Sequence, residues 1–211
     1  NLAWAQNSRI INIPANHPSG ENCQSCHQGE WQEWNRSHHQ KSMQIADDSS
    51  VLGDFNDVEI SINDEPVKLN KKNNEFWVDL ENQKYKVEYT FGFEPLQQYL
   101  IKSDNGKYQT LPYSWDSRPI EQGGQQWFHI YGEDHIPKND HLHWQQPLQN
   151  WNGMCADCHS TGLKRNYDTA TDTFNTNWQN INVGCASCHQ GDMKNIDNDD
   201  GNWTLIEGAK T

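Results

Sequence analysis

The sequence contains three copies of the pattern Cys-x-x-Cys-His, and these copies use all 6 cysteines of the 211-residue chain. They occupy residues 23–27, 155–159 and 185–189. This pattern is the attachment signature of c-type haem. Two thiols three positions apart can bond the two vinyl groups of one haem, and the imidazole that follows is then held against the iron. The sequence therefore predicts three covalently attached haems c. The predicted attachment cysteines are Cys23, Cys26, Cys155, Cys158, Cys185 and Cys188, and the predicted proximal iron ligands are His27, His159 and His189.

Other uses of the cysteines stay open but explain the pattern less well. Disulfide pairing gives no reason for a histidine after every cysteine pair. Structural zinc sites close a tetrahedron with four ligands, and three cysteine pairs do not make a whole number of all-cysteine sites. A redox-active Cys-x-x-Cys is expected once rather than three times. Because haem attachment by this route takes place on the outer face of the bacterial membrane, we expect a periplasmic or otherwise exported protein.

The composition on its own would indicate a disordered chain. Leu, Ile, Val and Phe make up about 17% of the residues and the net charge is -13, which is typical of intrinsic disorder. The 10 Trp and 7 Tyr argue against this interpretation, because disordered chains are poor in aromatic residues. We therefore expect the haems to form much of the core, lined by these aromatic residues, and we expect a haem-free chain to lack a stable fold.

The acidic charge limits the partners of the chain. A net charge of -13 disfavours binding to nucleic acid or to an anionic membrane, and it favours redox partner proteins with a basic docking face. No apolar run approaches the ~20 residues that a membrane-spanning helix needs. We therefore expect no membrane span.

The spacing of apolar residues predicts two kinds of local structure. Residues 29–46 contain good helix formers and predict a short helix. Between about 51 and 113, apolar and polar residues alternate, as in 58–62 and 76–80, with turn sequences between the runs. We expect a single trihaem cytochrome domain over 1–211. Its predicted fold class is mostly irregular and α, with a small antiparallel β insert at about 51–113.

The second axial ligand of each iron is expected from elsewhere in the chain. Of the 10 histidines, three are predicted proximal ligands and seven remain for at most three distal positions. Residues 123–151 are rich in aromatic and histidine residues, as a haem edge requires, and His129 and His143 in this stretch are candidate distal ligands. Methionine could ligate instead, but with histidine so abundant the Met residues are expected to serve in packing.

Several longer segments resemble a family of multihaem cytochromes c. GEWQEWNRSHHQKSM at 29–43, together with CADCHSTG at 155–162 and NVGCASCHQG at 182–191, is similar to the family that includes the tetrahaem electron-accepting cytochrome of nitrifiers. These segments are more closely similar to the haem modules of multihaem cytochromes associated with tetratricopeptide repeats. That closer group also shares WFHIYGE at 127–133, LHWQQPLQNWNGMC at 142–155 and NYDTATDTFNT at 166–176. The similarity covers most of 22–190.

The resemblance implies one more iron ligand. In that family a Trp-x-x-Ser-x-His segment supplies a distal histidine twelve positions after the first proximal one, which corresponds here to His39, as ligand of the haem at Cys185. The chain departs from the family after His189, because no further histidine follows. It also has neither a fourth attachment motif nor the helical repeats.

The motifs and the resemblance together favour electron transfer between redox partner proteins. Irons that are mostly ligated by two histidines would change oxidation state without binding a substrate. Two alternatives stay open: a haem enzyme in which one open iron acts on a small nitrogen or oxygen species, and a haem module of a larger assembly. An electron carrier is favoured over an enzyme, and the sequence points to no catalytic residues.

Overall fold

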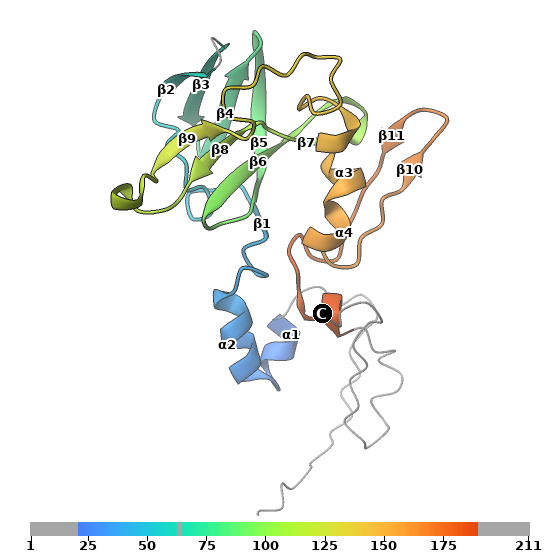
Figure 1. Ribbon diagram of the computed structural model, residues 1–211. Helices are drawn as coiled ribbons and strands as arrows, with labels where there is room; N and C mark the ends of the chain where they lie inside the picture. The colour runs from blue at the N-terminus through green and yellow to red at the C-terminus, as the bar shows by residue number, and fades with distance from the viewer. Residues whose placement is uncertain (1–20, 63–64, 190–211) are drawn as a thin grey trace, which may run out of the picture.

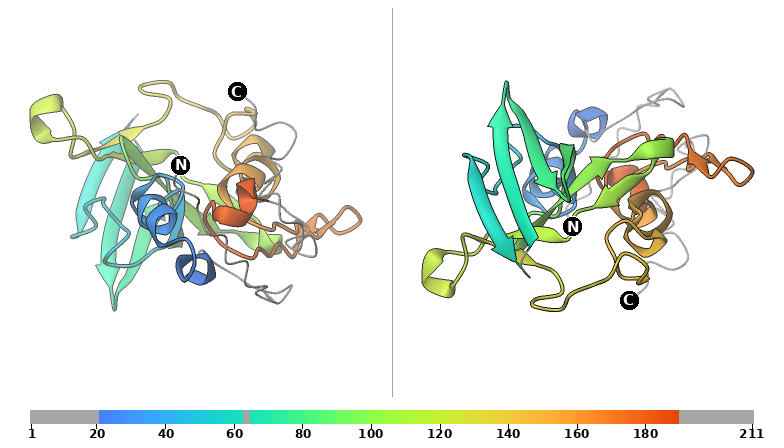
Figure 2. Two further views of the ribbon diagram at one scale, coloured as in Figure 1. Left: turned by 90° about the horizontal axis from the view of Figure 1, so that it is seen from below. Right: turned by 90° about the horizontal axis from the view of Figure 1, so that it is seen from above.

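The computed structural model describes residues 21–62 and 65–189, and it consists of a large antiparallel sheet with short helices beside and below it (Figure 1). The strands of this sheet are β1 (Met43–Ile45), β2 (Val58–Ile62), β3 (Glu65–Lys72), β4 (Glu75–Leu80), β5 (Gln83–Phe91), β6 (Leu96–Lys102), β7 (Tyr108–Thr110), β8 (Tyr113–Asp116) and β9 (Gln126–His129). Their order is β2-β3-β4-β5-β6-β8-β9, with β1 added to β5 and β7 added to β6. Because β9 comes back to β2, the sheet curls toward a closed barrel (Figure 2).

Alternating apolar residues explain the central strands. In β4, Phe76, Val78 and Leu80 are buried while the residues between them are more exposed. The turns that join β3 to β4 and β4 to β5 have positive φ at both central positions, Asn73-Asn74 and Glu81-Asn82. This is the conformation that closes tight two-residue hairpins. The strands that the alternation predicts are therefore confirmed.

The main hydrophobic core lies inside the curled sheet. Phe55 packs edge to face against Phe76, Tyr99 and Trp127, with ring centroids between 5.2 and 5.4 Å apart. The core has 13 buried residues, and none belongs to a Cys-x-x-Cys-His motif: Phe55, Val67, Leu69, Phe76, Val78, Leu80, Val87, Tyr99, Ile101, Leu111, Tyr113, Trp115 and Trp144. Side chains of the protein itself therefore fill this core.

The predicted fold class is wrong. In place of a mostly irregular and α fold with a small β insert, the described part of the chain is mostly β, with strands of one sheet from 43 to 129. Haems do not form the core of this sheet. Trp115, Trp127 and Trp144, which the composition argument would place around haems, pack in or against the core of the sheet. Aromatic side chains supply the apolar burial that the low count of Leu, Ile, Val and Phe leaves unexplained.

The helices are short. They are α1 (Glu21–Gln24), α2 (Gln28–Arg36), α3 (Trp151–Met154), α4 (Ala156–His159) and α5 (Cys185–Cys188), with the 3-10 turns η1 (Asp104–Gly106), η2 (Ile120–Gln122) and η3 (Pro147–Gln149). A small hairpin, β10 (Tyr167–Asp168) and β11 (Thr173–Phe174), projects from the side. The helix predicted over 29–46 ends at Arg36, because the N–H and the hydroxyl of Ser37 both bond the Trp34 carbonyl. No helix in the described ranges is long and apolar enough to cross a membrane.

A second, smaller cluster joins α3 and α4 to the sheet. Its buried members are Met43, Leu100, Trp151 and Ala156. The ring of Trp151 lies 5.5 Å from that of Trp178, measured between centroids. This cluster holds the second Cys-x-x-Cys-His motif, which includes α4, against the sheet.

Asn152 fastens α3 to three other segments through a fully buried side chain. Its Oδ1 accepts the Tyr108 N–H at 2.7 Å, and its Nδ2 donates to Thr176 Oγ1 at 2.8 Å and to the Gly106 carbonyl at 3.3 Å. Asn152→Ala is expected to lower the free energy of unfolding by about 2–4 kcal/mol, because three part-buried groups lose their hydrogen bonds to a buried side chain. Urea unfolding measures the loss, with the exposed Asn139 changed to Ala as the control. Equal stability of the two variants would contradict the fastening role.

Candidate haem attachment site

The three Cys-x-x-Cys-His motifs adopt the same local structure. In each motif the N–H of the histidine donates to the carbonyl of the first cysteine, at 2.8 Å in 23–27, 3.1 Å in 155–159 and 2.9 Å in 185–189. This bond closes one turn of helix. Residues three and four positions apart share one face of such a turn. Both thiols and the imidazole of each motif thus lie on one face, as attachment of one haem requires.

The first and third motifs lie next to each other, although they are far apart in the sequence. Burial raises the pKa of the Cys185 thiol, and the thiol of Cys23, which is hydrogen-bonded to it, raises this pKa further. In α2, the Trp34 Nε1 donates at 2.8 Å to the carbonyl of Val183, two residues before Cys185. The chain therefore folds back and brings α1, α2 and α5 together (Figure 1).

The second motif reaches the third through Thr161, two residues after His159. The Thr161 hydroxyl lies 2.6 Å from Ser187 Oγ, inside the third motif, and accepts the Gly184 N–H at 2.8 Å. A backbone bridge also pairs Thr161 with Asn180. All three predicted attachment sites thus form one cluster. The sequence carries no signal for Thr161 beyond its place just after a motif.

The predicted proximal ligand His159 packs against the end of the sheet. Its ring centroid lies 4.5 Å from that of Phe91. Burial lowers the pKa of the imidazole, and the nearby backbone carbonyl of Ser42 opposes this shift. The Nδ1 of His159 is buried and has no hydrogen-bond partner among the described residues. Burial also raises the pKa of the Cys155 thiol, and Cys158 adds to that shift. This surrounding fits a neutral imidazole that ligates iron.

A cavity of about 350 Å³ opens next to the first and third motifs. Its walls come from α2, β1, β5 and residues 178–182, and they include the aromatic side chains of Trp31, Trp34, Tyr89 and Trp178. The Trp31 Nε1 is buried and has no hydrogen-bond partner within the described part of the chain. This volume lies in the range of small-molecule sites. Flat aromatic walls suit a porphyrin and a buried N–H suits a propionate, so the residues present fit a haem.

The other uses of the cysteines gain no support. All six motif cysteines are free thiols. Over residues 21–62 and 65–189, no group of three or more His, Cys, Asp or Glu is placed to hold a metal ion directly.

The structure brings His39 to the third motif. His39 lies in the loop between α2 and β1, and its carbonyl accepts the N–H of Val183 at 3.2 Å, two residues before Cys185. Its side chain is exposed. The neighbouring His38 instead faces the ring of Phe93, with centroids 6.4 Å apart. Because the contact to Val183 is made by the backbone, His39 stays a predicted ligand of the haem at Cys185.

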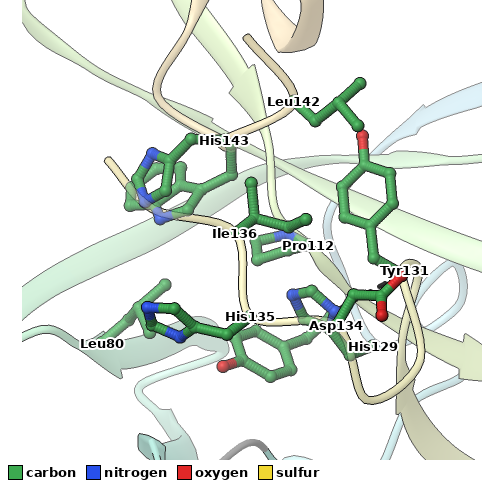
Figure 3. Close-up of a pocket in the computed structure, with 11 residues that line it drawn as sticks. Leu80, Pro112, His129, Tyr131, Asp134, His135, Ile136, Leu142 and His143 are labelled. Atoms are coloured by element: carbon green, nitrogen blue, oxygen red, sulfur yellow. Dashed lines mark hydrogen bonds between the residues drawn. The ribbon is translucent and has the colours of Figure 1, made fainter. Parts of the chain in front are cut away.

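The other two predicted distal ligands lie elsewhere. His129 and His143 line a pocket together with His135 and Leu80 (Figure 3). The pocket has a volume of about 30 Å³, room for roughly two water molecules and too little for a haem. This pocket lies far from the second motif. Leu80, in its wall, pairs with the first residue of β5, whereas the last residue of β5 contacts His159. A strand of this length spans about 30 Å. As haem ligands His129 and His143 stay predictions, and the structure does not bring them to a motif.

Buried polar contacts give His143 a different partner. Its Nε2 lies 3.6 Å from Glu81 Oε1, and Glu81 also accepts the Trp144 Nε1–H at 3.2 Å and pairs with Lys138. Burial alone would raise the pKa of the Glu81 carboxyl, but the bonds from Lys138 and Trp144 hold it below its ordinary value. Glu81 therefore ties residues 138–144 to the turn between β4 and β5.

Glu81→Gln is expected to destabilise the protein at neutral pH and to do so less in acid. Because the pKa of Glu81 is lower in the folded than in the unfolded state, its stabilising effect is present above about pH 4.5 and is lost as the pH falls through the folded-state pKa. Hydrogen bonds to a charged group contribute about 1.5–3 kcal/mol. Urea unfolding at neutral and acidic pH measures the difference. The control is Glu59→Gln, at an exposed pair with Lys68, and a loss for Glu81→Gln that is independent of pH would contradict this assignment.

Comparisons with known proteins agree with this arrangement. The family model described as cytochrome c554 and c-prime matches residues 22–73 and 125–190, together more than half of the chain and including all three motifs. A solved structure, the crystal structure of outer cell wall cytochrome OcwA, is similar over 91% of this chain, with a TM-score of 0.52 and 17% sequence identity. The chain spans 35% of that protein's chain, and the likeness shows a shared fold alone. A search of curated proteins gave no match.

Proposed function

Because the chain belongs to the cytochrome c554 and c-prime family, it is a c-type cytochrome with covalently bound haem, and we propose that it carries electrons between redox partners through three haems. The resemblance to multihaem cytochromes c that the sequence predicts is confirmed. Contact among the three motifs carries the proposal. The thiols of Cys23 and Cys185 are hydrogen-bonded, and Thr161, two residues after the second motif, is hydrogen-bonded to Ser187 inside the third. Haems attached at touching motifs would lie close enough to exchange electrons.

The residues of the cluster have separate roles in this proposal. A bound haem supplies a one-electron centre. The cysteine pairs would hold each haem, and the histidine of each motif would ligate its iron. His39 would be the second ligand at Cys185, and an iron held by two histidines would change oxidation state with little rearrangement. Trp31, Trp34 and Trp178 line the neighbouring cavity and would shield a haem edge from water, which tunes a reduction potential.

Charge and cofactor chemistry support two further parts of the proposal. The chain carries a net charge of -13, to which haem propionates add negative charge. A redox partner with a basic docking face would complement this surface, and its association rate should fall as the salt concentration rises. The route of haem attachment supports a periplasmic or otherwise exported location.

EPR spectroscopy of the oxidised holoprotein, on samples whose haem content is counted by pyridine haemochrome absorbance, tests the proposed function. We expect three haems per chain, with mainly low-spin ferric signals that disappear on reduction. A redox titration should show reversible one-electron steps. A spectrum dominated by high-spin ferric haem, or fewer than three haems on the full chain, would overturn the proposal.

One observation favours a second candidate function, a haem enzyme with an open iron. His129 and His143 line a separate pocket, so that of the predicted distal ligands, within the described residues, His39 alone is brought to a motif. An iron without a second histidine could bind a small nitrogen or oxygen species. Cyanide added to the oxidised protein and nitric oxide added to the reduced protein distinguish the candidates. Unchanged absorption spectra would exclude an accessible iron and leave electron transfer.

A further inference from the structure

The hydroxyl of Thr161 lies at the junction between the second and third motifs. Thr161 is 3% exposed and follows His159 by two residues. Its Oγ1 donates to the Asn182 carbonyl at 2.8 Å and accepts the Gly184 N–H at 2.8 Å. It also lies 2.6 Å from Ser187 Oγ, and because the Thr161 proton is directed to Asn182, Ser187 is the donor. One hydroxyl just after the second motif thus bonds two residues just before the third motif, Asn182 and Gly184, and one residue inside it, Ser187.

The packing around this hydroxyl leaves little room for adjustment. Gly184 directly precedes Cys185, and a Cβ on Gly184 would lie 2.8 Å from Asn180 Nδ2 and 3.3 Å from Thr161 Oγ1. The backbone of Thr161 also bonds that of Asn180 at 2.9 Å and that of Gln179 at 2.8 Å. Between the two motifs the chain forms the β10–β11 hairpin, whose strands are only two residues long and whose base is joined by backbone bonds between Lys164 and Asn177. The bonds at Thr161 are the ones that directly join the end of the second motif to the residues around the start of the third.

We infer that Thr161 is a positioning residue that sets the distance and the relative orientation of the second and third haems. This inference rests on the proposed function, because it needs a haem at both motifs. Each haem would be tied to its motif at three points, two thiols and one imidazole, so a shift of one motif against the other would move one haem relative to the other. The separation of two haems governs their magnetic interaction and the effect of the charge on one iron on the reduction potential of the other.

Thr161→Val in the full holoprotein removes the hydroxyl and nearly keeps the shape of the side chain. The Gly184 N–H then stays buried without its bond, and the part-buried Asn182 carbonyl loses one, which favours a shift of the segment that leads into α5. We expect an unchanged haem content and altered EPR signals of the interacting haems. We also expect at least one reduction equilibrium constant to change threefold or more, about 28 mV at 59 mV per tenfold for one electron. Thr161→Ser retains the hydroxyl and is expected to restore the original spectra and potentials.

Two further variants separate positioning from general damage. Ser114→Ala removes a hydroxyl that is buried in β8 and has no partner among the described residues, and it should leave the EPR signals and potentials unchanged. Ser187→Ala removes one of the three bonds and should change them in the same direction as Thr161→Val, which keeps the test decisive if the valine variant folds poorly.

The outcomes distinguish this inference from the proposed function. If Thr161→Val and Ser187→Ala both keep the original EPR signals and potentials, or if Thr161→Ser fails to restore them, Thr161 is not a positioning residue. Three low-spin haems in the unaltered protein would still support electron transfer in that case. A haem count below three in the unaltered protein would instead overturn the proposed function itself.

Discussion

Alanine at both Cys155 and Cys158 is expected to remove one haem of three and to leave the antiparallel sheet folded. These two thiols are the predicted covalent link of the second haem, so the haem content per chain should fall by about one third. The sheet should persist because its core of 13 buried residues includes no motif residue. Pyridine haemochrome absorbance and intact mass measure the haem, and far-ultraviolet circular dichroism measures the sheet.

The control for this double variant is Met154→Ala. Met154 directly precedes Cys155 and is 56% exposed, so the control should keep three haems and an unchanged sheet. Loss of the sheet signal together with the haem in the double variant would mean that haem supports the sheet as well as the motif cluster. Composition alone predicts that a haem-free chain lacks a stable fold. Because side chains of the protein itself form the core of the sheet, we instead expect residues 43–129 to stay folded without haem.

The early hairpins of the sheet can be predicted from the sequence, but the later strands cannot. Residues 58–62 and 76–80 alternate apolar and polar side chains, which is direct evidence of a strand with one buried face. In β8 all four residues are buried, so the sequence offers no alternation there. In β9 the residues Trp127 and Phe128 would suit a haem edge as well as a strand. A low aliphatic count misleads in such a chain because tryptophan and tyrosine fill the core.

The attachment motifs can also be predicted from the sequence, whereas the contacts that assemble them cannot. Cys-x-x-Cys-His can be identified from five consecutive residues. The bond from Trp34 to Val183 and the bond between Thr161 and Ser187 depend on partners far along the chain. Neither the tryptophan nor the threonine differs in sequence from residues with ordinary packing roles. The density of histidines in residues 123–151 suggests haem ligands, but His143 in this stretch contacts the buried network of Glu81 instead.

His39→Ala is expected to convert one haem of three from low-spin to high-spin ferric iron. The structure brings His39 to the segment that precedes Cys185, and removal of a distal imidazole leaves that iron with one protein ligand. Because the contact to Val183 is made by the His39 backbone carbonyl, alanine should preserve the local fold and the haem count. EPR and absorption spectroscopy of the oxidised protein measure the high-spin fraction, which should rise to about one third of the haem.

His38→Ala is the matched control, since His38 is the adjacent exposed residue of the same loop and its ring faces Phe93. It should keep the low-spin spectrum. Free imidazole added to the His39→Ala protein should restore the low-spin signal, because it can occupy the vacated position on the iron. If His38→Ala produces the high-spin signal instead, the two neighbours exchange roles. If both variants stay low-spin, the ligand of this iron comes from outside the loop between α2 and β1.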